Sequence, residues 1–276
     1  MTRPPATSPA PPDPAGHRVA AAAGLGLLIA ARLRDLHTEL EASGLGQGVA
    51  CVAEPHLSPA GPGEASAVAS MPPRRRLEFL AGRLAARRAL RAVGLDCGEI
   101  PRAGRLPQFP PGRAASISHS AGVAVAVARA PGRDTPLGCD LELRPLPAGA
   151  ARLVLREDEE EVLRAARPGG APWSVTALFS AKEAAWKALH TGQEALRRGE
   201  LRSLRDLRAR PCPDGLRVEA RTAAAPAVHV HVITAGPGVF STVLGRPAHR
   251  GDGPAVPAER GRLEGPAHRP GGAASR

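Results

Sequence analysis

The chain has 276 residues, enough to bury the core of one large domain or of two small ones. Its formal net charge of +11 indicates an anionic partner, although charge alone does not distinguish nucleic acid, a phosphate-rich cofactor, an acidic protein and a membrane surface. Aromatic residues make up 2% of the chain and tyrosine is absent, which argues against single-strand nucleic-acid binding through stacked aromatic rings.

The cysteine pattern argues against two further classes, the zinc-binding domain and the disulfide-rich secreted domain. The four cysteines lie far apart in the sequence, and no CxxC pair is present. A reducing, cytoplasmic location is therefore expected. The apolar run Val19 to Ala31 is too short to cross a bilayer, so no membrane association is expected. We expect this run to form a surface helix, or to precede the true translation start.

The first 73 residues contain predicted secondary structure but no recognisable motif. Residues 1–17 are rich in proline and alanine, which predicts disorder. Residues 19–42 predict a helix, because apolar residues recur there at helical spacing along one stripe. A short strand is expected at residues 48–53, and a loop with a single helical turn at residues 57–73. The residues of the apolar stripe are Leu25, Ile29, Leu33, Leu36 and Leu40.

Residues 74–93 predict a helix whose arginines lie on its apolar face. At about 100° per residue, Arg76, Arg83 and Arg87 fall within about 40° of one another, between two rows of leucine and phenylalanine. Buried charge without a partner is very costly, and no acidic stretch nearby supplies three carboxylates. We therefore predict that these arginines bind a polyphosphate ligand. The alternative is that their side chains follow the helix edge to solvent.

A loop rich in proline and glycine follows at residues 98–113 and contains Arg105. The sequence Ala-Ser-Ile-Ser-His-Ser at residues 115–120 then leads into an apolar strand, and the first half ends in the Pro-containing segment after it. Adjacent residues of a strand point to opposite faces, so Ser118 and His119 cannot belong to a Ser-His-Asp triad. A hydrolase of that kind is therefore not expected.

The second half opens with Gly-Cys-Asp-Leu-Glu at residues 138–142. Asp140 and Glu142 are two residues apart, so in a strand both carboxylates leave the same face. Adjacent carboxylates repel each other unless a cation joins them, which makes this pair a candidate platform for a hard metal ion. By itself the motif is weak, because Asp-x-Glu pairs are common by chance. An acidic helix with a solvated face is expected at residues 157–167.

The only two lysines of the chain lie in one predicted helix, residues 172–190. Lys182 and Lys187 persist in a chain that otherwise uses arginine, which indicates positions that need a compact and flexible charge. Glu183 and Lys187 share one helix face, and the simplest alternative is a surface ion pair worth about 0.3–0.5 kcal/mol. The role of Lys182 stays open. Strands in an antiparallel meander are expected next, at residues 216–221, 228–234 and 239–244.

Three of these blocks together resemble the 4′-phosphopantetheinyl transferases, and most closely the branch of the enterobactin-synthetase activating component. The family signature pairs a Gly-x-Asp-x-Glu strand with a [Trp/Phe]-x-x-Lys-Glu-Ala-x-x-Lys helix, and this chain matches it in residue type and in spacing. The arginine helix and the Pro-rich loop are also similar to that branch. The blocks are Ser-Ile-Ser-His-Ser at 116–120, Gly-Cys-Asp-Leu-Glu at 138–142 and Phe-Ser-Ala-Lys-Glu-Ala-Ala-Trp-Lys-Ala at 179–188.

The resemblance implies an α+β fold of two similar halves, which form a pseudo-dimer with the active site in the cleft between them. It implies transfer of the phosphopantetheine arm of coenzyme A to a serine of a carrier protein, with release of 3′,5′-adenosine bisphosphate. The expected domains are an extension at 1–44 that is disordered and then helical, an N-terminal half at 45–133, a C-terminal half at 134–245 and a disordered basic tail at 246–276.

The resemblance also implies a role for each matching residue. Asp140, Glu142 and Glu183 would bind Mg²⁺, or Mn²⁺ in its place. Glu183 would act as the base toward the carrier serine, directly or through a metal-bound water molecule, and Lys187 would neutralise the pyrophosphate. The residues expected to bind coenzyme A are Arg76, Arg83, Arg87, Arg105, Ser118, His119 and Lys187.

The expected partners are coenzyme A and acidic acyl- or peptidyl-carrier domains, for a monomeric protein that binds no nucleic acid. A bacterial pathway of secondary metabolism is the expected setting, because the composition is rich in arginine, alanine and proline. Two other functions compete with this one: a basic nucleic-acid-binding module and a Mg²⁺-dependent pyrophosphate hydrolase. The scarce aromatics and the clustered carboxylates argue against the first.

Overall fold

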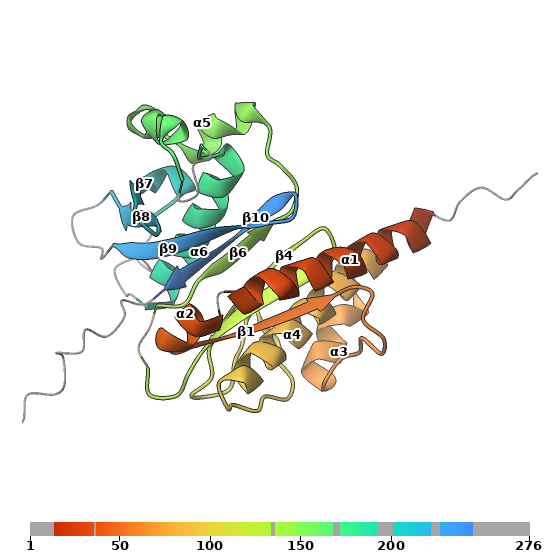
Figure 1. Ribbon diagram of the computed structural model, residues 1–276. Helices are drawn as coiled ribbons and strands as arrows, with labels where there is room; N and C mark the ends of the chain where they lie inside the picture. Colours follow the sequence, from red (N-terminus) through yellow and green to blue (C-terminus); the bar gives the residue numbers. More distant parts are fainter. Residues whose placement is uncertain are drawn as a thin grey trace, which may run out of the picture.

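The computed structural model describes residues 14–35, 37–133, 136–167, 172–192, 201–221 and 227–244. Within these ranges the chain has the predicted α+β architecture: two main antiparallel sheets lie side by side, with helices on both faces (Figure 1). None of the helices described is both long and apolar enough to cross a membrane. The predicted disorder of residues 1–13, Leu36 of the apolar stripe and the basic tail all lie outside the described residues.

The first sheet contains β1 (Leu45–Cys51), β5 (Val123–Arg129) and β4 (Ala115–Ser120), in that order and antiparallel. Helix α4 (Pro73–Ala92) packs on one face, against the alanines that alternate with valines along β5. The contact is close because small residues form it: a Cβ atom at Gly48 would collide with the α4 backbone at Ala85 and Ala89. Such packing lets the chain fill its core with few aromatic side chains.

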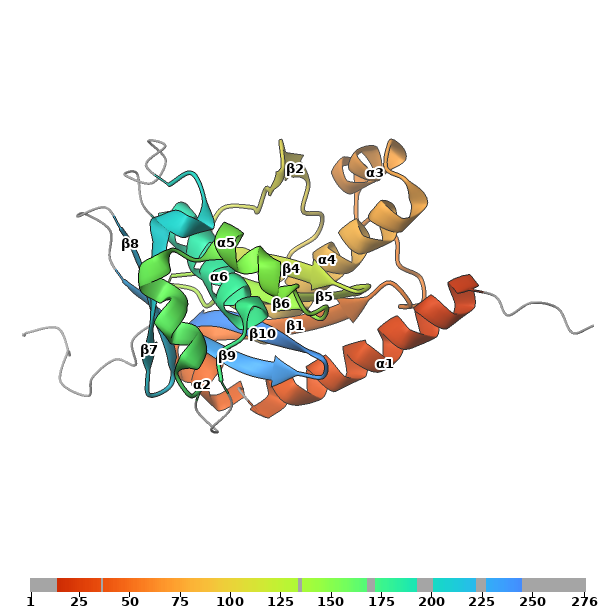
Figure 2. The ribbon, with the colours of Figure 1, turned by 90° about the horizontal axis from the view of Figure 1, so that it is seen from above.

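Helices α1 (Pro14–Asp35) and α2 (His37–Ala42) cover the opposite face, and Figure 2 shows α1 on one side of the strands with α4 and α6 on the other. Two predictions are wrong here. The backbone is helical from Pro14 onward, and the single helix expected at 19–42 is two helices. Ile29, Leu33 and Leu40 are at most 1% exposed and pack with residues of both sheets. This segment is therefore part of the core.

The second sheet has the strand order β6, β10, β9, β8, β7 and is antiparallel throughout. The predicted meander of β8, β9 and β10 is confirmed. Sequence analysis missed β7, because its two arginines and its proline obscure the alternation of apolar residues. The bounds are β6 Cys139–Glu142, β7 Leu207–Cys212, β8 Gly215–Ala220, β9 Val228–Ala235 and β10 Gly238–Leu244.

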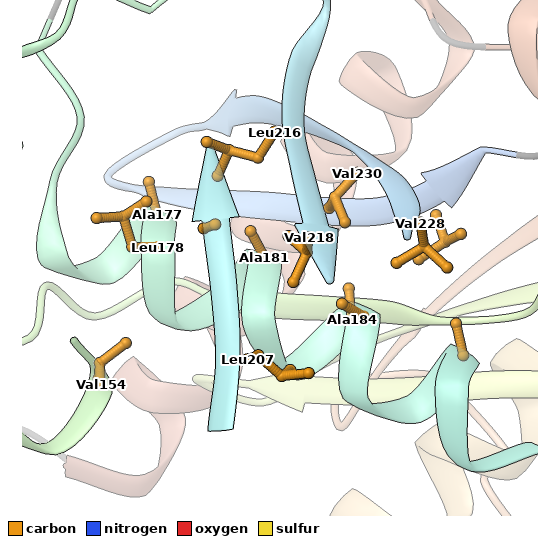
Figure 3. Close-up of a cluster of buried hydrophobic side chains, with 14 of the residues drawn as sticks. Val154, Ala177, Leu178, Ala181, Ala184, Leu207, Leu216, Val218, Val228 and Val230 are labelled. Atoms are coloured by element: carbon orange, nitrogen blue, oxygen red, sulfur yellow. The ribbon is translucent and has the colours of Figure 1, made fainter. Parts of the chain in front are cut away.

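Helix α6 (Val175–Gly192) packs its alanine face on the second sheet. Figure 3 shows Ala181 and Ala184 among Val218 and Val230 of the strands. The helix begins later than predicted, at Val175, because Ser174 caps it: the Ser174 hydroxyl oxygen accepts the N–H of Ala177 at 3.1 Å.

Short elements connect these layers. The predicted loop at residues 57–73 contains α3, and the loop at 98–113 contains the small hairpin of β2 and β3. The solvated acidic helix expected at 157–167 is a 3-10 helix, η2, and Glu159 on it is only 1% exposed, so the prediction of a purely solvated face is wrong. The bounds are α3 Pro62–Ala69, β2 Arg102–Ala103, β3 Leu106–Pro107, η1 Ala148–Ala150, α5 Ala151–Val154, η2 Glu157–Arg164 and η3 Leu204–Asp206.

Candidate active site

The three sequence blocks meet where the two sheets adjoin. Strands β4 and β6 are the edge strands of their sheets and contact each other, and α6 packs on β6. As a result the Ser-His block, the carboxylate pair and the lysine helix lie around one point. The charges of Lys187 and Asp140 influence the pKa of His119, and the same two charges influence the pKa of Glu183.

Asp140 is at the centre of this group and is 4% exposed. Its Oδ1 atom accepts two hydrogen bonds, one from Nζ of Lys187 at 2.8 Å and one from Oγ of Ser118 at 2.9 Å. Nζ of Lys187 also donates to the carbonyl oxygen of Cys139 at 2.9 Å. The other carboxylate oxygen, Oδ2, is buried and has no hydrogen-bond partner among the residues described. A buried oxygen without a donor is costly, and it is the atom that a cation would satisfy.

The neighbouring carboxylates are partly buried, and their pKa values are raised. Burial, followed by the charge of Asp140, raises the pKa of Glu142 to about 7. Burial likewise raises the pKa of Glu183, with a smaller contribution from Asp140. Burial alone would lower the pKa of Lys187, but its interactions with Asp140, Cys139 and Glu183 together outweigh burial, and the pKa lies above its ordinary value. Crowded carboxylates of this kind favour a bound cation.

The fit of these residues to Mg²⁺ rests on donor chemistry. Carboxylate oxygens are the ligands that hard divalent cations take, and Oδ2 of Asp140 is available. Across the described ranges, no group of three or more His, Cys, Asp or Glu side chains is already arranged to enclose a metal ion. The ligand set Asp140, Glu142 and Glu183 therefore remains a prediction.

Gly138 explains why the carboxylate strand begins with glycine. A Cβ atom at this position would collide with the carbonyl oxygen of Ala184 and lie 2.9 Å from the nitrogen of Ala188, both in the backbone of α6. The missing side chain lets α6, which carries Glu183 and Lys187, approach the strand that carries Asp140.

We expect Gly138→Ala to lower the free energy of unfolding by about 1–3 kcal/mol, because the added methyl group forces α6 away from β6. Urea unfolding measures the effect. The matched control is Gly149→Ala, since Gly149 is exposed and a Cβ atom there would meet nothing within 4 Å. Equal unfolding midpoints for the two variants would mean that α6 can shift at no cost.

Arg75 is a candidate site residue that sequence analysis missed. Its Nη1 atom lies 2.9 Å from Nε2 of His119. An arginine can only donate, so Nε2 accepts and the ring proton is assigned to Nδ1. Partial desolvation of the ring, and then the charge of Arg75, lowers the pKa of His119. His119 thus offers an N–H donor, while Arg75 supplies positive charge. The sequence does contain a signal for Arg75, the run of three arginines at 74–76. Sequence analysis selected only Arg76 from this run, because only Arg76 aligns with Arg83 and Arg87 on the helix.

The predicted row of inward arginines has partners within the protein. Nε of Arg83 donates to the carbonyl oxygen of Ile100 at 2.7 Å, and Nη1 of Arg87 pairs with the fully buried Glu64 at 2.6 Å. One carboxylate, not three, lies among these partners, and backbone carbonyl oxygens supply the others. Arg76 lies exposed, and its Nε donates to a carbonyl oxygen of α3 at 3.2 Å. Their contacts with coenzyme A, and that of the exposed Arg105, are untested predictions.

Lys182, whose role the sequence left open, lies in the interior and is 0% exposed. Its Nζ atom lies 2.8 and 2.9 Å from the two oxygens of Glu159 and donates to the carbonyl oxygen of Val154 at 2.8 Å. Arg221 donates to the same Glu159 at 2.8 Å. Lys182 therefore anchors α6 to η2, whereas Lys187 lies among the site carboxylates.

Ser118 and His119 point to opposite sides of β4, as the strand alternation predicts. Ser118 is 8% exposed, whereas His119 is exposed. The Ser118 hydroxyl group donates to Asp140 directly, so no Ser-His-Asp relay exists among these three residues. The predicted contact of Ser118 with coenzyme A is untested, and its single proton is already used by Asp140.

Comparison with known proteins agrees with this geometry. Residues 63–129 match the profile of the 4′-phosphopantetheinyl transferase N-terminal domain, and residues 136–233 match that of the 4′-phosphopantetheinyl transferase superfamily. The boundary between the two matches falls in the segment that links β5 to β6. The first match contains α4 and β4, and the second contains β6 and α6.

Curated relatives give the same family. The chain is 40% identical over 140 residues to the 4′-phosphopantetheinyl transferase Svp of Streptomyces mobaraensis, an alignment that covers 48% of this chain and 56% of Svp. It is 38% identical over 120 residues to enterobactin synthase component D of Salmonella typhi, which covers 42% of this chain and 48% of that protein. The chain thus spans about half the length of the curated relatives it matches. It belongs to the 4′-phosphopantetheinyl transferase superfamily, in the branch of the enterobactin-synthetase activating component.

Proposed function

We propose that this protein transfers the 4′-phosphopantetheine arm of coenzyme A to a serine of a carrier protein. Its family supports this reaction, and the Streptomyces relative carries that activity in its name. The observation that carries the proposal is the state of Asp140, whose Oδ1 is held by Lys187 and Ser118 while the buried Oδ2 has no donor in the part of the chain described. A cation on this carboxylate, beside an ammonium group, is suited to a pyrophosphate substrate.

In the proposed reaction, the carrier serine oxygen attacks the β-phosphorus of coenzyme A. The bond from that phosphorus to the bridging oxygen breaks, and 3′,5′-adenosine bisphosphate leaves with the electron pair. The serine proton passes to a base. Glu183 is the proposed base, since burial raises its pKa and makes it a better proton acceptor near neutral pH. Lys187 offsets the negative charge of the phosphates from the adjacent turn of α6.

Mg²⁺, when bound by Asp140, Glu142 and Glu183, would supply compensation for the charge that develops on the pyrophosphate. On the β4 side, Arg75 and the Nδ1–H of His119 provide donors suited to phosphate oxygens. The net charge of +11 suits an acidic carrier domain as the second substrate. We propose that the protein does this as a cytoplasmic monomer.

Mass spectrometry of carrier proteins tests the proposal. Apo carriers from fatty-acid, polyketide and nonribosomal-peptide systems are incubated with the protein, coenzyme A and Mg²⁺. A gain of one phosphopantetheine mass on the carrier, and none on a carrier whose acceptor serine is alanine, is the expected result. Release of 3′,5′-adenosine bisphosphate with every carrier unmodified would indicate a hydrolase. Salt-dependent retention on DNA without affinity for coenzyme A would indicate a nucleic-acid-binding module.

A further inference from the structure

Alternate serines of β4 join the two sheets. The hydroxyl oxygens of Ser116, Ser118 and Ser120 accept hydrogen bonds from alternate backbone N–H groups of β6 and of the residue that follows it, at 3.0, 3.2 and 3.1 Å. Side-chain oxygens thus take the place of the carbonyl groups that would pair two edge strands in a continuous sheet. The joint between the sheets is made by this row.

The serine row is in register with the Gly-x-Asp-x-Glu motif. The N–H groups that the serines accept belong to the residues that follow Gly138, Asp140 and Glu142. Ser116 therefore lies beside a position without a side chain, whereas Ser118 lies beside a carboxylate. A hydrogen bond from Ser120 lowers the pKa of Glu142, against the larger effect of burial. The spacing of serines on one strand matches the spacing of carboxylates on the other.

The hydroxyl group of Ser118 has no donor left for a phosphate ligand. It accepts from the N–H of Leu141 at 3.2 Å, donates its only proton to Oδ1 of Asp140 at 2.9 Å, and is 8% exposed. Oδ1 also accepts from Lys187. These two donors fix the plane of the carboxylate group and leave Oδ2 as its one open position within the described residues.

We propose that Ser118 is a positioning residue for the transfer reaction: its O–H holds the carboxylate of Asp140 so that Oδ2 stays available to a divalent cation. This inference rests on the proposed function, and it assigns the Ser118 hydroxyl group to Asp140 instead of to coenzyme A. Groups that orient a metal-binding carboxylate affect metal affinity and turnover more than the binding of the other substrate.

Ser116 provides a matched control. It is also 8% exposed and accepts an N–H group of β6 through the same atom, but it touches no carboxylate. Ser118→Ala and Ser116→Ala each remove one accepted N–H bond from the joint, and Ser118→Ala also removes the bond to Asp140, so the thermal midpoint should fall in both variants and at least as far in Ser118→Ala. Ser120 is unsuitable because of its bond to Glu142. The readouts are Mn²⁺ affinity by calorimetry without coenzyme A, and kcat and KM for coenzyme A in carrier modification.

Ser118→Ala is expected to weaken Mn²⁺ binding and to lower kcat by about 10–100-fold, with KM for coenzyme A unchanged within about twofold. Ser116→Ala should leave Mn²⁺ affinity unchanged, and Ser118→Thr, which keeps the hydroxyl group, should restore most of it. Equal Mn²⁺ affinities for the two alanine variants would overturn the proposal, as would a higher KM for coenzyme A with normal Mn²⁺ binding. If the wild type modifies no carrier, the transfer proposal fails, and the Mn²⁺ titrations still decide the role of Ser118.

Discussion

Asp140→Asn is expected to lower the rate of phosphopantetheine transfer by at least about 100-fold while the protein stays folded. Asparagine keeps the volume of the side chain and one oxygen for the bond from Ser118. It removes the negative charge and places an N–H donor where a cation needs the oxygen Oδ2. Mass spectrometry of the modified carrier over time measures the rate. Glu183→Gln should cause a comparable loss, because it removes both a proposed ligand and the proposed base.

The control for charge is Glu161→Gln, which neutralises an exposed carboxylate of η2 and should leave transfer unchanged. Metal addition provides a second readout. At about 100 times its Kd, Mg²⁺ should stabilise the wild-type protein by roughly 2.7 kcal/mol and the Asp140→Asn variant far less. A variant that keeps wild-type turnover, or the full Mg²⁺-dependent rise in thermal midpoint, would exclude Asp140 as a metal ligand.

The part of the site that sequence could predict is the part fixed by local periodicity. Alternation along a strand places Ser118 and His119 on opposite faces, as observed, and the structure adds that Ser118 is the buried one. The i, i+4 spacing places Lys187 on the Glu183 side of α6 and Lys182 on another. The same periodicity predicted the meander and the arginine helix, because both extend over enough residues for the pattern to be clear.

Pairings between distant segments could not be predicted. Arg87 meets Glu64, and Lys182 meets Glu159, each across 23 residues of chain. No local sequence pattern indicates which of the 26 acidic residues pairs with a given lysine or arginine. The inward arginines were therefore interpreted as a site for an external anion, whereas Arg87 is paired with Glu64, a buried glutamate of α3. For α1 the apolar stripe fitted a surface helix and a core helix equally, and only the packed structure distinguishes them.

Glu159→Gln is expected to lower the free energy of unfolding by about 3–5 kcal/mol, because it leaves the ammonium group of Lys182 buried without a counter-charge. The Lys182 side chain is 0% exposed, and the other acceptor of its ammonium group, the carbonyl oxygen of Val154, carries no charge. Urea unfolding measures the loss, which corresponds to a drop in thermal midpoint of roughly 10 °C for a domain of this size. Glu160→Gln is the control, since Glu160 is exposed on the same 3-10 helix and should change stability by less than about 0.5 kcal/mol.

The reverse substitution should cost less, because Glu159 keeps a charged partner. In Lys182→Met, Arg221 still donates to Glu159 at 2.8 Å, so the carboxylate is not left unpaired. The double variant should be more stable than the sum of the two single losses predicts, with a coupling energy of about 0.5–3 kcal/mol. KM for coenzyme A should be unchanged in Lys182→Met, since the ammonium group lies in the interior. A large rise in KM with normal stability would instead make Lys182 a phosphate ligand, and the two lysines of the helix would then share one role.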